Sequence, residues 1–334
     1  MLRAILLILN YSLIFASYTP VSTSEEIDTF KDEALVQLAY SDSLHDNVGE
    51  LYRYITNHIT GITLGYSYGS TTYIGGKTCF TSAHCEQQLF KFSLEPVTVH
   101  YEVVFEINGQ KKKPYKATQF ICYPQYKQNH KYDLAILILE EPVAELKEFK
   151  ISEEFSNSQT YENYQHLLTY IGYGVKVFDN NYFLMEDNKR RALRAYTQEC
   201  SLRANDLGIY STPYGQYNRS KASRPLEDYE VGSREGMSGG AVININHELV
   251  GIIRGTQFPN QFSWQQSIYN AIASVINIVP LSIDACCYPM PYFASFPATS
   301  SPGTRTRSIP LAPFKTWIDG IRQQYDDTYL ADRV

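Results

Sequence analysis

Short apolar runs and alternating patterns divide most of the chain into segments of strand character. The segment YEVVFEINGQ, from Tyr101 to Gln110, alternates apolar and polar residues and includes Asn108-Gly109, the commonest dipeptide of tight hairpins. LAILIL, from Leu134 to Leu139, is a continuous apolar run, as expected for a strand that is buried on both faces. AVININHELVGIIRG, from Ala241 to Gly255, holds two strand-like runs with Asn246-His247 between them. Turn signals recur roughly every 8–15 residues, so the pattern predicts an all-β barrel or sandwich.

Two segments depart from this strand pattern. FKTWIDGIRQQY places Phe314, Trp317, Ile318 and Ile321 at helical spacing and predicts a helix near the C-terminus. Residues 25–58 mix polar and apolar positions without a clear period, and we interpret them as a leader with some helix.

The first residues, MLRAILLILNYSLIFAS, have the layout of a secretory signal peptide. One arginine precedes an apolar run that ends in small residues. The run is short and polar sequence follows quickly, which disfavours the alternative of a membrane anchor or a buried helix. We expect a signal peptide over residues 1–22, a leader of uncertain structure over 23–60, and a secreted or periplasmic location.

Composition excludes one broad class of partner. The 334 residues carry a formal net charge of −6, with acids and bases mixed throughout. The basic stripe that a nucleic-acid-binding protein needs is missing from the sequence. The run Lys189-Arg190-Arg191 can be interpreted as a binding patch or as solvated surface, and we favour solvated surface.

Because export exposes a protein to an oxidising environment, we expect disulfide bonds. The spacing of the six cysteines selects none of the fifteen possible pairings. The sequence has no C-x-x-C pair and no clustered histidines, so we predict no metal site and no cofactor. The six cysteines are Cys79, Cys85, Cys122, Cys200, Cys286 and Cys287.

A single serine, Ser238, lies among glycines in the stretch EGMSGGAV. Apart from a plain glycine-rich turn, this stretch fits the Gly-x-Ser-x-Gly elbow of α/β-hydrolases, in which an acid and then a histidine follow the serine. Only His247 follows Ser238, nine residues later, and no acid–histidine pair stands at a plausible spacing. The chain order therefore excludes the elbow.

The opposite order, histidine, aspartate and then serine, is present. TCFTSAHC ends a strand-like run with His84, and YDLAILIL places Asp133 at the start of the strand that looks most buried, 49 residues later. Ser238 follows after another 105 residues. A serine hydroxyl needs a base to take its proton and an acid to orient that base. We therefore expect Asp133 to fix the imidazole of His84 and its Nε2 to face Ser238.

These three segments resemble the active-site blocks of the trypsin/chymotrypsin-like serine proteases. GYG at 172–174, KRRALRAYT at 189–197, LVGIIRG at 249–255 and PGTRTRSIPLAPFKTWI near the end follow in the order of that family. The resemblance covers roughly residues 61–324 and implies a peptidase domain over 61–325.

The resemblance implies two orthogonally packed six-stranded β-barrels, a C-terminal helix, and an active site between the barrels. It implies His84, Asp133 and Ser238 as the catalytic residues. It also implies an oxyanion hole formed by the backbone N–H groups of Gly236 and Ser238. Residues around 256–302 exceed what the family places there, and we expect an insertion.

Met237 is a departure from the family, many members of which carry an aspartate before the serine. That aspartate pairs with a new N-terminus after proteolytic activation, and a methionine cannot form this ion pair. The usual Ile-Val-Gly-Gly entry motif is missing as well. We therefore expect packing around Met237 to hold the oxyanion loop, so that removal of the signal peptide alone gives a competent enzyme.

Cysteines and pocket residues depart too. Cys85 has a family counterpart, but its usual partner, about fifteen residues upstream, is missing. The position of the pocket floor falls on Gly232, which argues against a preference for lysine or arginine substrates. We place Arg254 and Gly255 of the cleft strand in the substrate pocket, where Arg254 would favour an acidic side chain.

The sequence thus predicts a secreted serine endopeptidase, a hydrolase that acts through an acyl-enzyme on Ser238. A catalytically inactive homologue that serves as a secreted binding protein is the alternative, and the complete catalytic set argues against it. Chain order disfavours an esterase on another scaffold. We expect a protein or peptide substrate, a monomer, no nucleic-acid partner, and no membrane contact after signal removal.

Overall fold

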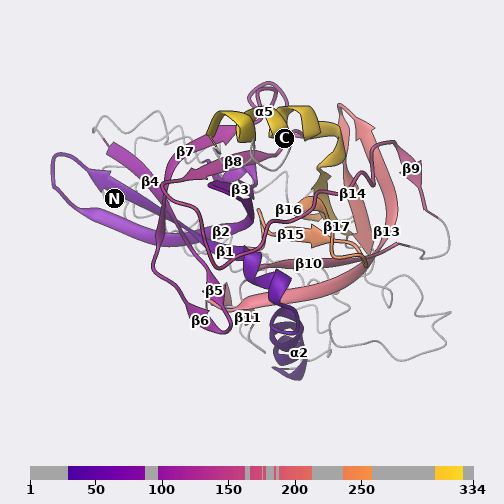
Figure 1. The fold of residues 1–334 in the computed structure, drawn as a ribbon, viewed down its shortest axis with the longest axis horizontal. Coiled ribbons are helices and arrows are strands. Elements are labelled where there is room, and N and C mark those ends of the chain that lie inside the picture. The colour runs from indigo at the N-terminus through magenta and orange to yellow at the C-terminus, as the bar shows by residue number, and fades with distance from the viewer. Residues whose placement is uncertain are drawn as a thin grey trace, which may run out of the picture.

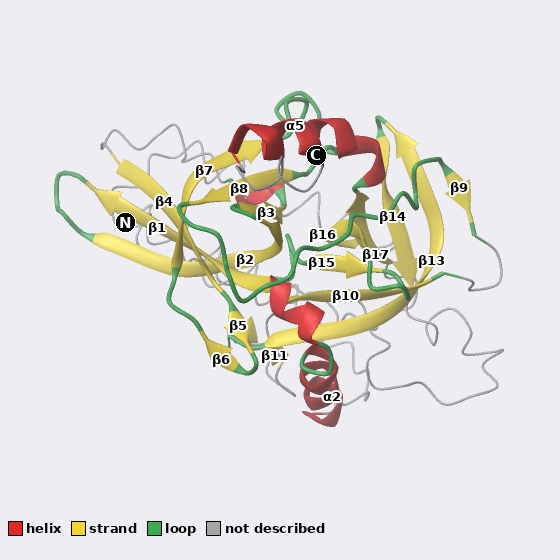
Figure 2. Cartoon of the chain, viewed as in Figure 1, coloured by secondary structure: helices red, strands yellow, loops and turns green. Residues whose placement is uncertain are grey.

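The computed structural model describes residues 29–86, 97–161, 166–174, 176–177, 184–185, 188–212, 236–257 and 305–325. Strands dominate these residues, and the helices lie outside the sheets (Figures 1 and 2). The predicted signal peptide and nearly all of the predicted insertion over 256–302 lie outside the described residues.

The first barrel closes in the order β1-β2-β3-β8-β7-β4, with every neighbouring pair antiparallel. The run predicted as a buried strand forms β8, in which all five residues are buried. The predicted tight hairpin at Asn108-Gly109 is also present, and both residues have the positive φ that such a turn requires. The strands and the flanking hairpin are β1 (Val48–Asn57), β2 (Thr63–Gly75), β3 (Thr78–Thr81), β4 (Val97–Val104), β5 (Glu106–Ile107), β6 (Gln110–Lys111), β7 (Tyr115–Cys122) and β8 (Ala135–Leu139).

The second barrel is also closed by six strands, because β10 pairs with both β13 and β15. The ring runs β10-β15-β16-β17-β14-β13, and β9 adds to the outside of β13. The prediction of two six-stranded barrels is therefore confirmed. The strands are β9 (Gln159–Thr160), β10 (Leu167–Tyr173), β13 (Arg190–Arg203), β14 (Asp206–Thr212), β15 (Ala241–Ile243), β16 (Leu249–Gln257) and β17 (Arg305–Pro310), with a separate pair β11 (Lys176–Val177) and β12 (Leu184–Met185).

The predicted C-terminal helix is present as α5 (Lys315–Tyr325), which follows the short helix η5 (Ala312–Phe314). Although β17 of the second barrel leads into it, α5 lies over β7 and β8 of the first barrel (Figure 1). Phe314 and Ile318 are buried in the same apolar cluster as Phe80 of β3. No helix within the described ranges is long and apolar enough to span a membrane.

The N-terminal segment corrects the prediction of a leader over residues 23–60. The strand β1 lies inside that range, so the first barrel begins at Val48 rather than after residue 60. Ahead of it, α2 (Thr29–Ala39) packs on β13, and the short helix η1 (Ser43–Asn47) leads into β1. These residues are an integral part of the folded domain.

Two arginines predicted as solvated surface, Arg190 and Arg191, are instead fully buried. The Nη2 atom of Arg190 is 2.5 Å from Asp46 Oδ1, and Arg190 Nη1 donates to the carbonyl of Glu106 at 3.0 Å. Arg191 Nη1 donates to the carbonyl of Gly174 at 2.6 Å, just beyond the end of β10. The Asp46–Arg190 ion pair therefore connects the N-terminal segment to the second barrel.

Candidate active site

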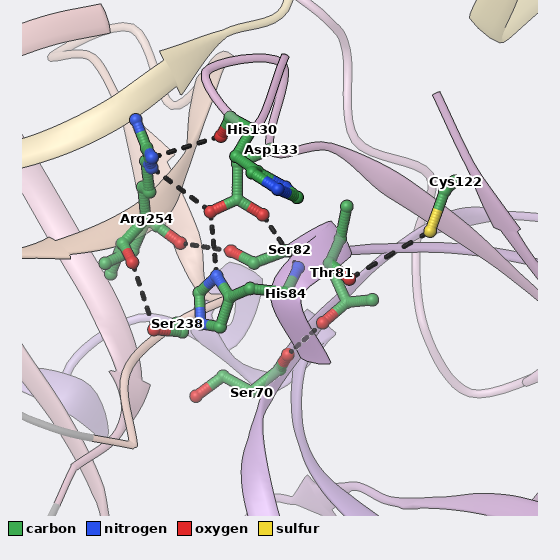
Figure 3. Close-up of polar contacts among 11 residues, drawn as sticks. Ser70, Thr81, Ser82, His84, Cys122, His130, Asp133, Ser238 and Arg254 are labelled. Atoms are coloured by element: carbon green, nitrogen blue, oxygen red, sulfur yellow. Dashed lines mark hydrogen bonds and ion pairs between the residues drawn. The ribbon is translucent and has the colours of Figure 1, made fainter. Parts of the chain in front are cut away.

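The histidine and the aspartate predicted as catalytic lie together where β3 ends and β8 begins. The short helix η2 (Ala83–Cys85) follows β3 and carries His84, whereas Asp133 lies just before β8. The two residues meet because β3 and β8 are antiparallel neighbours, with Thr81 opposite Ala135. His84 Nδ1 is 2.7 Å from Asp133 Oδ2, and the His84 backbone N–H donates to Asp133 Oδ1 at 2.8 Å (Figure 3).

The surroundings of this pair favour an ionised aspartate and a basic histidine. Burial disfavours the charge of Asp133, but hydrogen bonds from His84 and the positive charges of His84 and Arg254 outweigh it and lower the pKa of Asp133. Burial also disfavours the imidazolium, yet the neighbouring Cys85 and Asp133 raise the pKa of His84 well above its usual value. Since Nδ1 binds the carboxylate, Nε2 is the ring nitrogen that can accept a proton.

The loop that carries Ser238 fits between the barrels because its glycines have no side chains. Gly239 has a φ of +89°, in the left-handed region. A Cβ atom on Gly239 would lie 2.0 Å from the carbonyl oxygen of Ser70, and one on Gly240 would lie 2.1 Å from the carbonyl oxygen of Ile171. Ser70 belongs to β2 and Ile171 to β10, so the loop contacts both barrels.

The side chain of Ser70 connects this loop to both barrels. Ser70 is fully buried; its Oγ accepts from the Tyr173 N–H at 2.8 Å and donates to the Gly236 carbonyl at 2.9 Å. The Ser70 N–H in turn donates to the Ser238 carbonyl at 2.8 Å. Ser70 therefore fixes the backbone beside Gly236 and Ser238, whose N–H groups are the predicted oxyanion hole.

Packing around Met237 holds the middle of the loop. Met237 is 1% exposed and belongs to the apolar cluster of the second barrel, together with Tyr170 and with Leu35 of α2. The backbone of the loop is tied to β16 as well, since the Gly239 N–H donates to the carbonyl of Ile253 at 2.8 Å. Activity without proteolytic activation stays a prediction.

The hydroxyl of Ser238 donates to the backbone carbonyl of Arg254 at 3.1 Å. Figure 3 shows Ser238 beside the ring of His84, with Asp133 on the other side of that ring. The three predicted catalytic residues thus come from both barrels and meet at one place.

Comparison with known families agrees with this architecture. The family model described as Trypsin matches residues 58–279, well over half of the chain. The chain belongs to the trypsin family. Among solved structures, one that is similar is neuropsin, a serine protease expressed in the limbic system of mouse brain, with 12% sequence identity and a TM-score of 0.45. The likeness covers 84% of this chain and 95% of that chain, and a comparison with curated proteins finds no match.

The predicted substrate pocket of this trypsin-family chain is only partly within the described residues. Gly232 lies outside them, whereas Arg254 and Gly255 lie on β16. Arg254 Nε donates to Asp133 Oδ2 at 3.2 Å, and its Nη2 donates to the carbonyl of His130 at 3.1 Å. Two of its three nitrogens therefore bind the protein itself, and selection of acidic substrates by Arg254 stays a prediction.

Disulfide bonds are not formed by the four cysteines within the described residues, so the expectation of disulfides finds no support there. These are the free thiols of Cys79, Cys85, Cys122 and Cys200, whereas Cys286 and Cys287 lie outside the described part of the chain. A Cβ atom on Gly69 would lie 3.2 Å from Cys85 Sγ. This chain thus has a glycine, Gly69, at the position from which a cysteine could form a disulfide bond with Cys85.

Sequence reasoning missed two contributions to the site. Ser70 lies in the run GSTTY, whose small polar residues give no sign of a buried hydroxyl that bridges two barrels. Arg254 was placed at the cleft by its position in LVGIIRG, but its contact with Asp133 joins residues 121 positions apart. A pattern along the chain carries no signal for either contact.

Proposed function

We propose that the chain is a secreted serine endopeptidase that cleaves protein or peptide substrates through an acyl-enzyme on Ser238. The observation that carries the proposal is the buried Asp133 carboxylate bound to Nδ1 of His84, next to Ser238. Membership of the trypsin family supports peptide-bond hydrolysis, and the signal-like first residues support export.

In the acylation step, the Ser238 hydroxyl leaves the carbonyl of Arg254 and donates to Nε2 of His84. The ring takes the proton as Oγ attacks the scissile carbonyl carbon, and Asp133 stabilises the imidazolium that forms. The imidazolium then protonates the leaving amine. In the second half, His84 takes a proton from a water molecule as its oxygen attacks the acyl carbon. The bond from that carbon to Ser238 Oγ then breaks, and the imidazolium returns its proton to Oγ.

The oxyanion of the tetrahedral intermediate would be bound by the backbone N–H groups of Gly236 and Ser238. Such donors act strongly when they are held in place before the reaction begins. The hydrogen bonds of Ser70 to Gly236 and Ser238 supply that fixation here.

Activity of this site would not depend on cleavage near residue 60. The turn between β1 and β2 lies at residues 58–62, so a cut there would open a hairpin of the first barrel. The burial of Met237 and the contacts of Ser70 supply loop anchors that involve no new N-terminus. A gain of activity on cleavage near residue 60 would contradict this part of the proposal.

A fluorophosphonate probe tests the proposal directly, since it labels only an activated serine. We expect the folded wild-type chain to be labelled on Ser238, and both Ser238→Ala and His84→Ala to be unlabelled. Folding of each variant is checked by circular dichroism and thermal unfolding. Folded wild type that resists labelling, or equal labelling of Ser238→Ala, would overturn the peptidase and favour an inactive homologue that binds other molecules.

A further inference from the structure

Arg254 contacts two of the three predicted catalytic residues. Its Nε donates to Asp133 Oδ2 at 3.2 Å, the same oxygen that lies 2.7 Å from His84 Nδ1. Its carbonyl oxygen accepts the Ser238 hydroxyl at 3.1 Å. The Arg254 side chain is 20% exposed, and its Nη2 donates to the carbonyl of His130, which fixes the far end of the guanidinium (Figure 3).

Two cationic groups therefore share one carboxylate oxygen. Because both bind Asp133 Oδ2, His84 Nδ1 and Arg254 Nε can be no more than about 6 Å apart. A positive charge at this distance disfavours a second one, and screening by water is reduced because the carboxylate is buried. Arg254 thus offsets part of the stabilisation that Asp133 gives to the imidazolium.

We propose that Arg254 is a positioning residue that fixes Asp133 and keeps His84 neutral, and so able to accept a proton, at a lower pH than the carboxylate alone would allow. The inference rests on the proposed function, because a neutral base matters only if Ser238 reacts. It assigns the guanidinium to the catalytic pair rather than to a substrate side chain.

The nearest other titratable groups do not supply this effect. Cys85 and Asp133 both favour the imidazolium of His84 and act in the opposite direction. Burial raises the pKa of Cys122 and of Tyr126, so both side chains are uncharged at neutral pH.

Four further charged groups lie near Arg254 or Cys122. Lys131 and Arg307 stand near Arg254, and burial together with the neighbouring positive charges, that of Arg254 included, lowers the pKa of both side chains. Lys127 and Glu86 lie next to Cys122 instead. All four remain in place when Arg254 alone is changed, so a matched set of variants isolates the guanidinium.

The test compares wild type with Arg254→Gln, which keeps a hydrogen-bond donor without the charge, and with Arg254→Lys, which keeps the charge. Histidine labelled with carbon-13 at Cε1 is titrated by NMR, and the His84 signal is assigned from its loss in His84→Gln. We expect the His84 midpoint to rise by about one pH unit in Arg254→Gln and to stay near wild type in Arg254→Lys. The acid limb of the fluorophosphonate labelling rate should move by the same amount.

Equal His84 midpoints in wild type and Arg254→Gln would overturn the proposal. So would an equal shift in Arg254→Gln and Arg254→Lys, because contact geometry rather than charge would then be responsible. A purely structural role would lower labelling at every pH without moving the acid limb. If Arg254→Gln does not fold, Arg254→Met serves as the second neutral variant. Unlabelled wild-type Ser238 would refute the peptidase while the NMR titration still measures the effect of Arg254.

Discussion

Replacing Ser70 by alanine removes one hydroxyl that holds two buried backbone groups. The Tyr173 N–H, 2.8 Å from Oγ, loses its acceptor, and the Gly236 carbonyl, 2.9 Å from Oγ, loses its donor. A buried polar group without a partner costs about 1–3 kcal/mol. Two such groups would cost up to about 6 kcal/mol, and partial hydration at the half-buried Gly236 lowers this to about 2–4 kcal/mol.

A loss of this size leaves a domain folded if its stability lies in the usual range of about 5–15 kcal/mol. Urea unfolding followed by tryptophan fluorescence measures the change in unfolding free energy. Fluorophosphonate labelling is then measured under conditions where Ser70→Ala is fully folded. We expect the labelling rate constant of Ser238 to fall about 10- to 100-fold, because the oxyanion donors are no longer fixed.

Ser211→Ala is the matched control for this prediction. Ser211 is equally buried and is hydrogen-bonded to the Tyr170 hydroxyl at 2.6 Å, but it lies on β14, which does not pair with β15, the strand after the nucleophile loop. The Ser211→Ala variant should have a lower free energy of unfolding than wild type, and its Ser238 should be labelled at the wild-type rate. Labelling of Ser70→Ala at the wild-type rate would show that Ser70 does not position the loop, and the reasoning would be refuted.

Three further predictions concern stability. Arg190→Met leaves the buried Asp46 carboxylate unpaired and should lower the free energy of unfolding in urea by about 3–5 kcal/mol. Adding Asp46→Leu should restore part of this stability. An unchanged unfolding free energy in Arg190→Met would contradict a stabilising role of the Asp46–Arg190 ion pair. Gly69→Cys should form a disulfide with Cys85, adding about 3 kcal/mol by closing a loop of about 15 residues, and alkylation of both thiols without reduction would disprove it. Asp133 has a lowered folded-state pKa, so its contribution is present above an unfolded pKa of about 3.9 and is lost as pH falls through the folded value. The difference in stability between wild type and Asp133→Asn should therefore shrink on acidification below about pH 4, and a constant difference would count against the ion pair.

The catalytic candidates and the two barrels could be predicted because their signals are local. His84 and Ser238 stand in short blocks whose residue types serve the chemistry directly, and Asp133 precedes a run that is apolar enough to be buried on both faces. Chain order then separated the two serine-hydrolase architectures without any knowledge of distances.

The N-terminal part of the barrel could not be predicted in the same way. The strand β1 contains Glu50 and Arg53, which are 1% and 3% exposed, so its polar residues resemble those of a solvated leader. Glu50 is matched by Lys111, 61 positions away, and Arg190 by Asp46, 144 positions away. A buried charge is stabilised by its partner in space, and periodicity along the chain does not contain that partner.

The position of α5 has a consequence for how the molecule is made. Phe314 and Ile318 complete an apolar cluster that includes Phe80 of the first barrel, although they follow every strand of both barrels in the sequence. Synthesis proceeds from the N-terminus at about 5–20 residues per second, so all strands of the first barrel are made well before α5 can contribute to its core. The core of the first barrel is therefore completed only after the strands of the second barrel have been made. A nascent chain that already contains His84, Asp133 and Ser238 still lacks α5, the helix that contributes to this core.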